Sequence, residues 1–432
     1  VNNPDTSLDV DVNNNTIQSS EVGVFTFTAS ADATFSIQDN DFQNFANDEV
    51  FVDDSAGVLT LDDVLNNQGN TFDPDGEVVS DQIRVNGTAP ADTVVNLDTG
   101  ATFTGSTAIQ DAVDNANSDN RLRVGSGRFD ESVTIDVENL TLEGPNAGVA
   151  GDSDQRGSEA LINNTNADTG GAISIVSPGV TVDGLQIESD AQDGISVSEP
   201  VDNVTIQNNR ITSVEGLGTV GSNNGDRATG NGIAFGLPRD TPQTTVTGAV
   251  IKDNVIAGVS TTDLASSEDR TTANGIQVLT RQHNVEGMNI TGNVISNLEP
   301  GASGDSGDNR SRGIVINVGN DSSTIGAADG FTIAGNSISG LTGAGGFSDA
   351  AGIALFEAGG AAGDGTDRIG PENFTVANNQ LDDLTNTGKD PAPAIFVGGI
   401  QTLGDSHSVT GNTINSGSVI RFAGNQPGFD PA

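Results

Sequence analysis

The sequence predicts an all-β fold, a parallel β-helix in which short strands stack as successive coils of one solenoid. One observation is a phrase of the form apolar-Thr-Ile, two residues, Asn, one residue, Ile, which recurs around Asn209, Asn254, Asn293, Asn336, Asn379 and Asn412. These asparagines are 45, 39, 43, 43 and 33 residues apart. Another observation is a Gly-Ile strand phrase between the copies, as at 232–235 and 275–278. Repetition without a fixed length is typical of stacked coils with loops of variable size.

We expect the repeated asparagines to have a structural role. Apolar residues two positions apart in each phrase point the same way, into the coil. Asn tolerates left-handed backbone and forms local hydrogen bonds at turns. Stacking would then place each of the six asparagines over the next, as an Asn ladder inside one bend of the coil and not as catalytic groups.

Residues 106–118 carry the clearest helical pattern in the chain. The apolar residues from Ile109 to Ala116 fall at positions i, i+3, i+4 and i+7, which gives one apolar stripe. Thr107 begins a segment with the spacing of a capping box. Strand-like segments follow at 122–124 and 133–135, separated by a Gly-rich turn.

This order of helix, strand, Gly-rich turn and the segments E-S-V-T-I-D (131–136) and L-T-L-E-G (140–144) resembles the opening of pectin-lyase-like right-handed parallel β-helix proteins. The resemblance covers about residues 100–420. It implies right-handed coils and an amphipathic helix that covers the first of them, and it is specific for the fold, not for a reaction. We therefore expect a right-handed parallel β-helix of about seven or eight coils over 96–432, with its capping helix at 106–118.

Residues 1–95 are predicted to form a β-rich N-terminal module. They are rich in Asp, Asn and Thr and contain faint copies of the main phrase, such as Asn15-Thr16-Ile17 and Phe35-Ser36-Ile37. These copies favour coils within the module. A small β-sandwich is the alternative.

The composition indicates a folded protein with a uniformly acidic surface. Asp plus Glu number 60 against 16 Lys plus Arg, for a net charge of -44, and only two of the 16 are lysines. The acids are scattered among regularly spaced Ile and Val, and such a surface stays hydrated at very high salt. In this respect the chain resembles proteins of extreme halophiles. The charge argues against nucleic acid and anionic membranes as partners, and no apolar run has the length of a membrane-spanning helix.

The ends of the sequence suggest a processed chain. It begins with Val1, has no signal peptide and has no cysteine, so it forms no disulfide. We expect an extracellular or cell-surface location for the chain or for a larger protein of which it is a piece. Asn309 and Asn320 lie in exposed-looking Asn-x-Ser sequons and are candidates for glycosylation.

Acidic and basic residues gather at the ends of three consecutive loops. These candidate binding residues stand three to six positions before successive Gly-Ile strands, or directly beside them: Asp226, Arg227, Asp269, Arg270, Asp308, Arg310 and Arg312. One interpretation is a groove that binds a carboxylated sugar or a metal ion. The other is an Asp–Arg ladder that ties down exposed loops.

Two Gly-rich acidic loops are candidate cation sites. Asp73, Asp75 and Glu77 form one set, and Asp364 and Asp367 form the other. Hard cations bind such oxygens, although neither loop is a full EF-hand or calcium repeat. Solvated acidic loops are the alternative interpretation. We expect no organic cofactor, with calcium as the candidate ion.

The resemblance also implies motifs for enzymes of this fold that the chain lacks. Its only histidines, His283 and His407, lie outside any Gly-His-Gly segment, and no Arg-Ile-Lys segment occurs. Trp and Tyr, which line sugar-binding grooves, are absent. The leading expectation is therefore a non-enzymatic extracellular scaffold or adhesin, in contact with a glycan or surface layer. Its open last coil would self-associate head-to-tail into filaments.

Two alternatives to the scaffold stay open. One is a polysaccharide lyase or glycoside hydrolase that acts on acidic glycans in a groove beside Arg227, Arg270 and Arg310. The other is a non-catalytic glycan-binding module, which would show affinity for the same glycans without turnover.

Overall fold

The structure is a computed structural model that describes most of the chain. The described residues are 92–165, 170–216, 227–238, 242–263, 270–301, 308–318, 327–343, 350–357, 371–386, 392–398, 407–415 and 419–423, the short strands 218–219, 320–321 and 324–325, and eight strands within 8–85. No helix within these ranges has the length and apolar character needed to cross a membrane.

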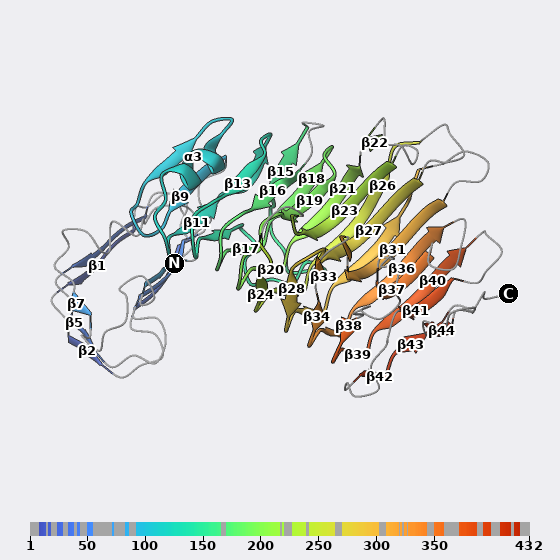
Figure 1. Cartoon of the computed structure of the whole chain (residues 1–432). Coiled ribbons are helices and arrows are strands. Elements are labelled where there is room, and N and C mark those ends of the chain that lie inside the picture. Colours follow the sequence, from blue (N-terminus) through green and yellow to red (C-terminus); the bar gives the residue numbers. More distant parts are fainter. Residues whose placement is uncertain are drawn as a thin grey trace.

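Nine successive strand triplets wind into a solenoid, and each triplet adds one strand to each of three long sheets (Figure 1). Within the triplets every pairing between neighbouring coils is parallel. The expected parallel β-helix is thus confirmed. The number of coils exceeds the seven or eight expected, because the first three triplets lack the Asn of the repeated phrase.

The three sheets are named here by their order within a coil. Sheet 1 contains β10 (Thr102–Thr104), β9 (Thr93–Asn96), β11 (Arg121–Val124), β14 (Thr141–Glu143), β17 (Thr181–Asp183), β20 (Thr205–Gln207), β25 (Val250–Lys252), β29 (Asn289–Thr291), β35 (Thr332–Ala334), β39 (Thr375–Ala377) and β42 (Ser408–Thr410). Sheet 2 contains β12 (Gly127–Phe129), β15 (Ala160–Asn164), β18 (Gln186–Ser189), β21 (Arg210–Gly216), β26 (Val255–Thr261), β30 (Val294–Leu298), β36 (Ser337–Gly343), β40 (Gln380–Asn386) and β43 (Thr413–Ile414).

Sheet 3 carries the Gly-Ile phrases. It contains β13 (Val133–Ile135), β16 (Gly171–Ile175), β19 (Asp193–Val197), β23 (Arg227–Gly236), β27 (Arg270–Leu279), β31 (Asp308–Val318), β37 (Ala350–Glu357), β41 (Pro393–Gly398) and β44 (Val419–Ala423). The two-residue strand β22 (Gly218–Thr219) pairs antiparallel with β23, and β32 (Asn320–Asp321) pairs with β33 (Thr324–Ile325).

Stacked aliphatic side chains fill the interior of the coils. Ile206, Ile251 and Ile290 are register partners in sheet 1, and all three are fully buried. Burial of one such side chain stabilises the fold by about 2 kcal/mol. The same pairing repeats coil after coil, so the alternation read from the sequence forms one continuous core.

The six repeated asparagines form one buried column at the bend between sheets 1 and 2. Asn254 Oδ1, for example, accepts hydrogen bonds from the backbone N–H and from Nδ2 of Asn209, at 3.0 and 3.1 Å. The column begins where Leu185 N–H donates to Asn209 Oδ1 at 3.0 Å, and it ends at Asn412. Leu185 occupies the ladder position in the preceding coil, which explains why the repeated phrase is absent there.

The residue before each ladder Asn turns the chain in a left-handed backbone conformation. Asn208, Asp253 and Gly292 have φ values of 56°, 54° and 67°. Only Gly, Asn and Asp adopt this conformation at low cost. The bend of each coil is therefore encoded by a pair of residues, one for the backbone turn and one for the ladder.

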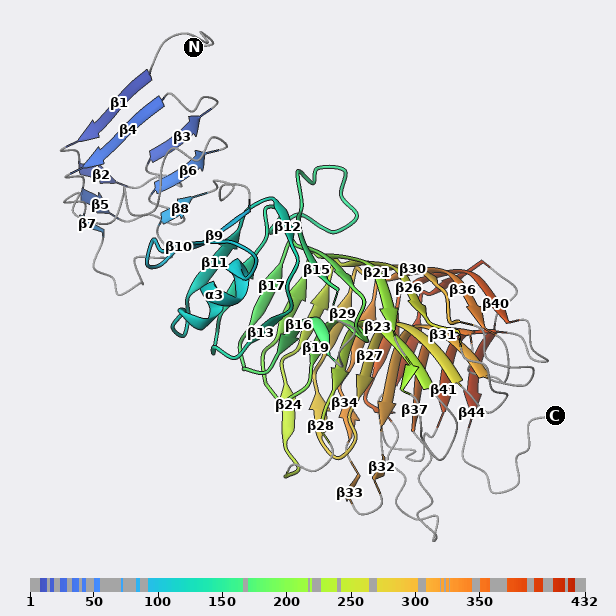
Figure 2. The same cartoon turned by 90° about the horizontal axis from the view of Figure 1, so that it is seen from above.

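The predicted helix is present but shorter than 106–118. Helix α3 spans Ala108–Asp114 and buries Ala108, Ile109, Ala112 and Val113 against the first coil, at the N-terminal end of the rod (Figure 2). Thr107 makes no side-chain cap hydrogen bond. Instead, the carboxylate of Glu131 accepts from the backbone N–H groups of Ile109 and Gln110, both at 3.0 Å. The capping group comes from the strand region that follows the helix, so the local capping-box pattern did not identify it.

The N-terminal strands are also paired in parallel. They are β1 (Leu8–Asn13), β2 (Thr16–Gln18), β3 (Val24–Thr28), β4 (Ala33–Gln38), β5 (Asp41–Gln43), β6 (Val50–Asp54), β7 (Thr71–Phe72) and β8 (Ile83–Val85). β1 pairs with β4, β2 with β5 and then β7, and β3 with β6 and then β8. This is the connectivity of coils, whereas a β-sandwich has antiparallel sheets. β9, which straddles residue 95, belongs to sheet 1.

A fourth, narrower sheet forms on the approach to sheet 1. It consists of β24 (Thr245–Thr247), β28 (Asn284–Glu286), β34 (Ala328–Asp329) and β38 (Pro371–Glu372), all parallel. Its inward residues Val246, Val285 and Ala328 are buried, so its other side faces solvent.

Candidate functional site

The basic residues predicted at the loop ends come together on three adjacent strands of sheet 3. Arg227 of β23 is the register partner of Arg270 of β27, and Arg270 in turn pairs with Asp308 of β31. Arg310 and Arg312 follow two and four residues after Asp308. Asp226 and Asp269 lie outside the described residues, as do the side chains of Arg227, Arg270 and Asp308.

Arg312 lies on the outer face of sheet 3. A Cβ atom at Gly313 would lie 2.6 Å from Cγ2 of the core residue Ile338, so this position faces inward. Arg312 precedes Gly313 and faces outward. Val315 is also on the outer side, where it packs in a small buried cluster that is separate from the core. Alternation along the strand places Arg310 on the same outer face.

Arg312 ends a row of buried polar residues that crosses four neighbouring strands. Its register partner is Asn274, which pairs with Asn231, which pairs with Asp193. Asn231 Nδ2 donates to Asp193 Oδ1 at 2.7 Å, and Asn274 Nδ2 donates to Asn231 Oδ1 at 2.8 Å. We call these four residues the polar row.

The polar row is almost inaccessible to water. Asn231 and Asn274 have no exposed surface, and Arg312 and Asp193 are 5% and 7% exposed. Burial raises the pKa of Asp193 to about 7, although the hydrogen bond from Asn231 acts in the opposite direction. A carboxyl group that changes its protonation state near neutral pH is typical of functional sites.

A second outward row beside the polar row is open to solvent. Thr229, Thr272 and Arg310 are register partners in β23, β27 and β31, and all three are partly exposed. Arg310 and the neighbouring Thr residues therefore form an accessible part of this face. Four of the chain's 16 cationic residues, Arg227, Arg270, Arg310 and Arg312, belong to three adjacent strands of a protein with net charge -44.

Sequence reasoning missed Asp193, Asn231 and Asn274 as members of this site. Each stands directly before the Gly of a Gly-Ile phrase, as does Arg312. The signal was a polar residue at one repeat position in four consecutive coils, and it becomes visible only when the coils are aligned by their glycines.

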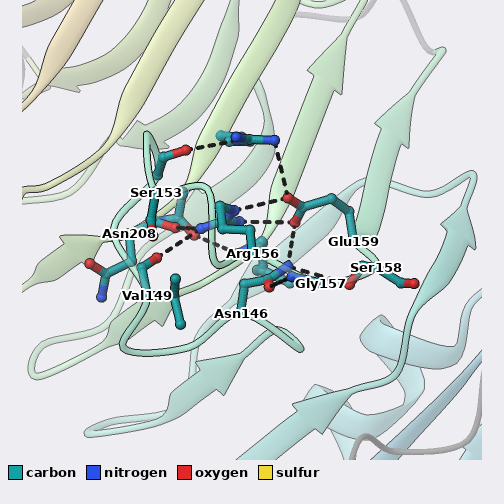
Figure 3. Close-up of polar contacts among 12 residues, drawn as sticks. Asn146, Val149, Ser153, Arg156, Gly157, Ser158, Glu159 and Asn208 are labelled. Carbon is teal, nitrogen blue, oxygen red and sulfur yellow. Dashed lines mark hydrogen bonds and ion pairs between the residues drawn. The ribbon is translucent and has the colours of Figure 1, made fainter.

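A different polar cluster, in the loop between β14 and β15, is structural (Figure 3). Arg156 has a side chain that is 2% exposed and forms a two-armed ion pair with Glu159, through Nε and Nη2, both at 2.9 Å. Its Nη1 donates to the carbonyl oxygens of Val149 at 2.9 Å and Asn208 at 2.6 Å. We call residues 144–159 the clasp loop.

The clasp loop ties non-adjacent coils together. It starts in the second triplet, reaches Asn208 in the fourth through Arg156, and reaches the fifth where Gly151 N–H donates to Asp253 O at 2.8 Å. Asn146 Nδ2 completes the cluster with a 2.8 Å hydrogen bond to Glu159 Oε2. Because the charged groups saturate one another, the cluster stabilises the rod and offers no reactive group.

The carboxylates predicted as cation ligands are not placed by the structure. Asp73, Asp75, Glu77, Asp364 and Asp367 lie outside the described residues. Among the residues that are described, no group of three or more His, Asp or Glu is arranged to hold a metal ion.

The two expected glycosylation positions lie on strands. Asn309 is half-buried in β31 and its Oδ1 accepts from Thr271 Oγ1 at 3.2 Å. Ser311, which completes its sequon, is fully buried. Asn320 belongs to β32, and its side chain lies outside the described part of the chain.

His283 is a fully buried residue that hydrogen-bonds through both ring nitrogens. Its Nε2 lies 3.1 Å from Pro238 O, which can only accept a hydrogen bond, so Nε2 carries the proton. Its Nδ1 lies 2.9 Å from Thr244 Oγ1. His407 stacks on Phe374 with ring centroids 4.5 Å apart. Neither histidine lies on the outer face of sheet 3.

Comparisons with known proteins support the fold. No family model and no curated protein sequence matches the chain. Among solved structures, an alginate lyase from Paenibacillus sp. str. FPU-7 matches with 14% identity and a TM-score of 0.36, over 74% of this chain and 96% of that one.

Two further solved structures are similar over the same part of the chain. Dettilon tailspike protein matches with 15% identity and a TM-score of 0.29, over 76% of this chain and 66% of that one. A PL6 alginate lyase in complex with a trisaccharide matches with 10% identity and a TM-score of 0.25, over 74% and 85%. At these identities the similarity concerns the parallel β-helix fold alone.

The comparisons contradict the leading expectation of a non-enzymatic scaffold or adhesin. The similar solved structures include alginate lyases and the catalytic domain of Agl-KA. The scaffold hypothesis is therefore wrong against these findings, whereas self-association of the chain stays a prediction. It relied on missing sequence motifs, and the residues of a site on a solenoid come from different coils, so they need not form a motif along the chain.

Proposed function

We propose that the chain is a polysaccharide lyase or glycoside hydrolase that binds an acidic glycan along the outer face of sheet 3. The observation that carries this proposal is the placement of Arg310 and Arg312 on that face in β31, beside the strands β23 and β27, which begin with Arg227 and Arg270. In a protein of net charge -44, arginines on three neighbouring strands are the feature most suited to an anionic ligand.

Arginine suits the carboxylate of an acidic sugar. Its planar guanidinium donates two parallel hydrogen bonds to a carboxylate and remains charged at every working pH. Neighbouring strands lie ~4.8 Å apart, so a glycan lying across β23, β27 and β31 meets Thr229, Thr272 and Arg310 in turn. The partly exposed row provides the contacts, and the buried polar row supports it from the side.

Either reaction would use these arginines. In a β-elimination, the substrate carboxylate must be neutralised before the adjacent C–H bond gives its proton to a base; the electron pair then forms a C=C bond as the glycosidic C–O bond breaks and the leaving oxygen takes up a proton. In a hydrolysis, water replaces the leaving group, and the carboxylate contact orients the sugar for attack. Action on a polysaccharide also fits an extracellular location, which we retain as part of the proposal.

The test is depolymerisation of polyuronates by the whole chain and by an Arg310→Ala, Arg312→Ala variant. Arg128→Ala is the matched control, because Arg128 is an exposed arginine on sheet 2 with a side chain that is 55% exposed. We expect activity in the parent and control chains and its loss, by at least about tenfold, in the double variant.

The product and the ion requirement separate the remaining possibilities. An unsaturated, ultraviolet-absorbing sugar end identifies a lyase, and a new reducing end without it identifies a hydrolase. Parallel assays with calcium and with a chelator test the calcium expectation. Binding without turnover would instead make the chain a glycan-binding module, and equal activity in the double variant would overturn this location of the site.

A further inference from the structure

The polar row has a direction that is set at one end. The carboxylate of Asp193 can only accept hydrogen bonds, so it requires the NH₂ group of Asn231 to face it. The carbonyl oxygen of Asn231 must then face the next strand, where it accepts from the NH₂ group of Asn274. The same logic leaves Asn274 Oδ1 directed toward β31, where the register partner of Asn274 is Arg312.

The last acceptor of the row is deeply buried. Asn274 has no exposed surface, and its Oδ1 accepts no hydrogen bond within the described part of the chain. A buried acceptor raises the negative potential around it when no donor compensates it. The register partner of Asn274 on β31 is Arg312, whose positive charge that potential attracts.

We propose that Asp193 is a positioning residue for Arg312 and that it acts through the aligned amides of Asn231 and Asn274. The proposal rests on the proposed function, in which the buried Arg312 supports the ligand-contacting row of Arg310 from the side. Asp193 lies three strands from Arg312, which is ~14 Å at the usual strand spacing, so a direct ion pair between them is excluded. The two amide dipoles carry the influence of the carboxylate across that distance.

The direction of the row depends on the protonation of Asp193. As an acid, Asp193 can donate its proton to Asn231 Oδ1, which turns the Asn231 amide around. Asn231 Nδ2 would then donate to Asn274 Oδ1, and the NH₂ group of Asn274 would face Arg312. Two donors would then face each other, which repels the guanidinium.

Asp193 is free to act in this way because its surroundings carry no other charge that shifts its pKa. Its register partner on β16 is Gly171, which has no side chain, and its partner on β23 is the neutral Asn231. Burial and the hydrogen bond from Asn231 are the causes of its raised pKa. The row therefore has two states, one for each direction of its hydrogen bonds, and near neutral pH both are populated.

The first test needs no ligand. NMR spectra of the whole chain labelled with ¹⁵N-arginine are followed from about pH 5 to 9, around the pKa of Asp193, and the Arg312 signal is identified by its loss in Arg312→Lys. We expect the Arg312 guanidinium signal to shift with a midpoint near the pKa of Asp193, and the shift to vanish in Asp193→Asn. A titration that persists in that variant would overturn the relay.

The second test moves the carboxylate of the polar row from position 193 to position 274. Asp193→Asn alone removes the group that fixes the direction, and we expect it to weaken polyuronate binding at pH 8 by about tenfold, the size of one charge-assisted hydrogen bond. The double variant Asp193→Asn, Asn274→Asp keeps the net charge and allows a fully satisfied row in the reverse direction. It places the carboxylate at the register partner of Arg312, so we expect polyuronate binding to be restored although position 193 no longer carries a carboxylate.

The two tests separate failure of the relay from failure of the proposed function. Unchanged binding and an unchanged pH profile in folded Asp193→Asn would overturn the relay, while the activity of the parent chain would still support the proposed function. Absence of polyuronate binding in the parent chain would overturn the proposed function, and the NMR titration would still decide the relay. Failure of the Asp193→Asn, Asn274→Asp variant to recover binding, with a native circular dichroism spectrum, would show that Asp193 acts only as a structural residue.

Discussion

Asn254 holds Asn209 of the preceding coil through a single oxygen atom, which accepts hydrogen bonds from the backbone N–H and the side-chain NH₂ of Asn209 at 3.0 and 3.1 Å. Asn254 itself donates from Nδ2 to Ile206 O, at 2.9 Å. Neither asparagine has exposed surface. One side chain thus satisfies three buried backbone and side-chain groups on the neighbouring coil.

Substitution of this residue, Asn254→Leu, should lower the free energy of unfolding by about 3 kcal/mol. Leu is similar in size to Asn, but two buried donors of Asn209 and the carbonyl oxygen of Ile206 lose their partner. Each unsatisfied group costs about 1–3 kcal/mol. Chemical denaturation measures the change. Asn289→Leu is the control, because Asn289 is an exposed asparagine in the next coil. Equal stability of the two variants would show that the ladder is not a source of stability.

The raised pKa of Asp193 predicts that its contribution to stability falls as the pH rises. The ordinary value is 3.8 and the folded value is about 7, so the folded state keeps a proton that the unfolded chain loses between these values. The stabilisation is complete below about pH 4 and is lost as the pH passes through about 7.

Asp193→Asn should remove this dependence. Its Tm relative to the parent chain should rise between pH 4 and 7, by an amount that corresponds to at most about 4 kcal/mol at one pKa unit per 1.4 kcal/mol. The difference between the two chains isolates Asp193 from the other 59 acidic residues, which both contain. A constant difference in Tm across this range would contradict the pKa shift.

The contacts of the clasp loop predict that Arg156→Met lowers the stability of the chain. Arg156 is buried and holds Glu159 together with the carbonyl oxygens of Val149 and Asn208. Breaking a buried pair leaves an uncompensated charge, so the variant should lose about 3 kcal/mol of stability. It should also be cut faster by protease within 144–159. Arg128→Met, which removes an exposed arginine paired with Asp130, should leave both quantities nearly unchanged.

The coils could be predicted from the sequence because their determinants repeat at short range. Each of the six ladder asparagines lies in one phrase with its strand of sheet 1, as Asn209 does with Ile206, and the inward side chains alternate visibly. The count of coils was too low because Leu185 takes the ladder position and ends the phrase. Counting coils by their Asn therefore misses a coil in which another residue type occupies the ladder position.

The candidate site could be predicted only in part. The three loop ends do adjoin, since neighbouring coils are in register, but the sequence did not show that Asp308 and not Arg310 pairs with Arg270. The clasp loop was not predictable, because Arg156 and Asn208 are 52 residues apart and their contact does not repeat. Contacts that occur once along a solenoid leave no periodic trace in its sequence.

The narrow fourth sheet predicts a dependence of stability on salt. Glu286, Asp329 and Glu372 are successive register partners on its solvent side, and the strands lie ~4.8 Å apart. Like charges directly opposite one another on neighbouring strands are destabilising. Asn373 Nδ2 donates to Asp329 Oδ1 at 2.7 Å, which offsets the repulsion only in part.

Salt should therefore raise the Tm of the parent chain more than that of an Asp329→Asn variant. Between about 0.1 M and about 1 M salt the screening length falls from ~10 Å to ~3 Å, which is shorter than the distance between the strands. Asp329 is the middle carboxylate, so its neutralisation separates Glu286 from Glu372 and should flatten the salt response. Glu199→Gln serves as the control, because Glu199 is an exposed acid without a carboxylate partner on a neighbouring strand among the described residues. If Asp329→Asn and Glu199→Gln change the salt response equally, the repulsion is a property of the whole acidic surface and not of this column.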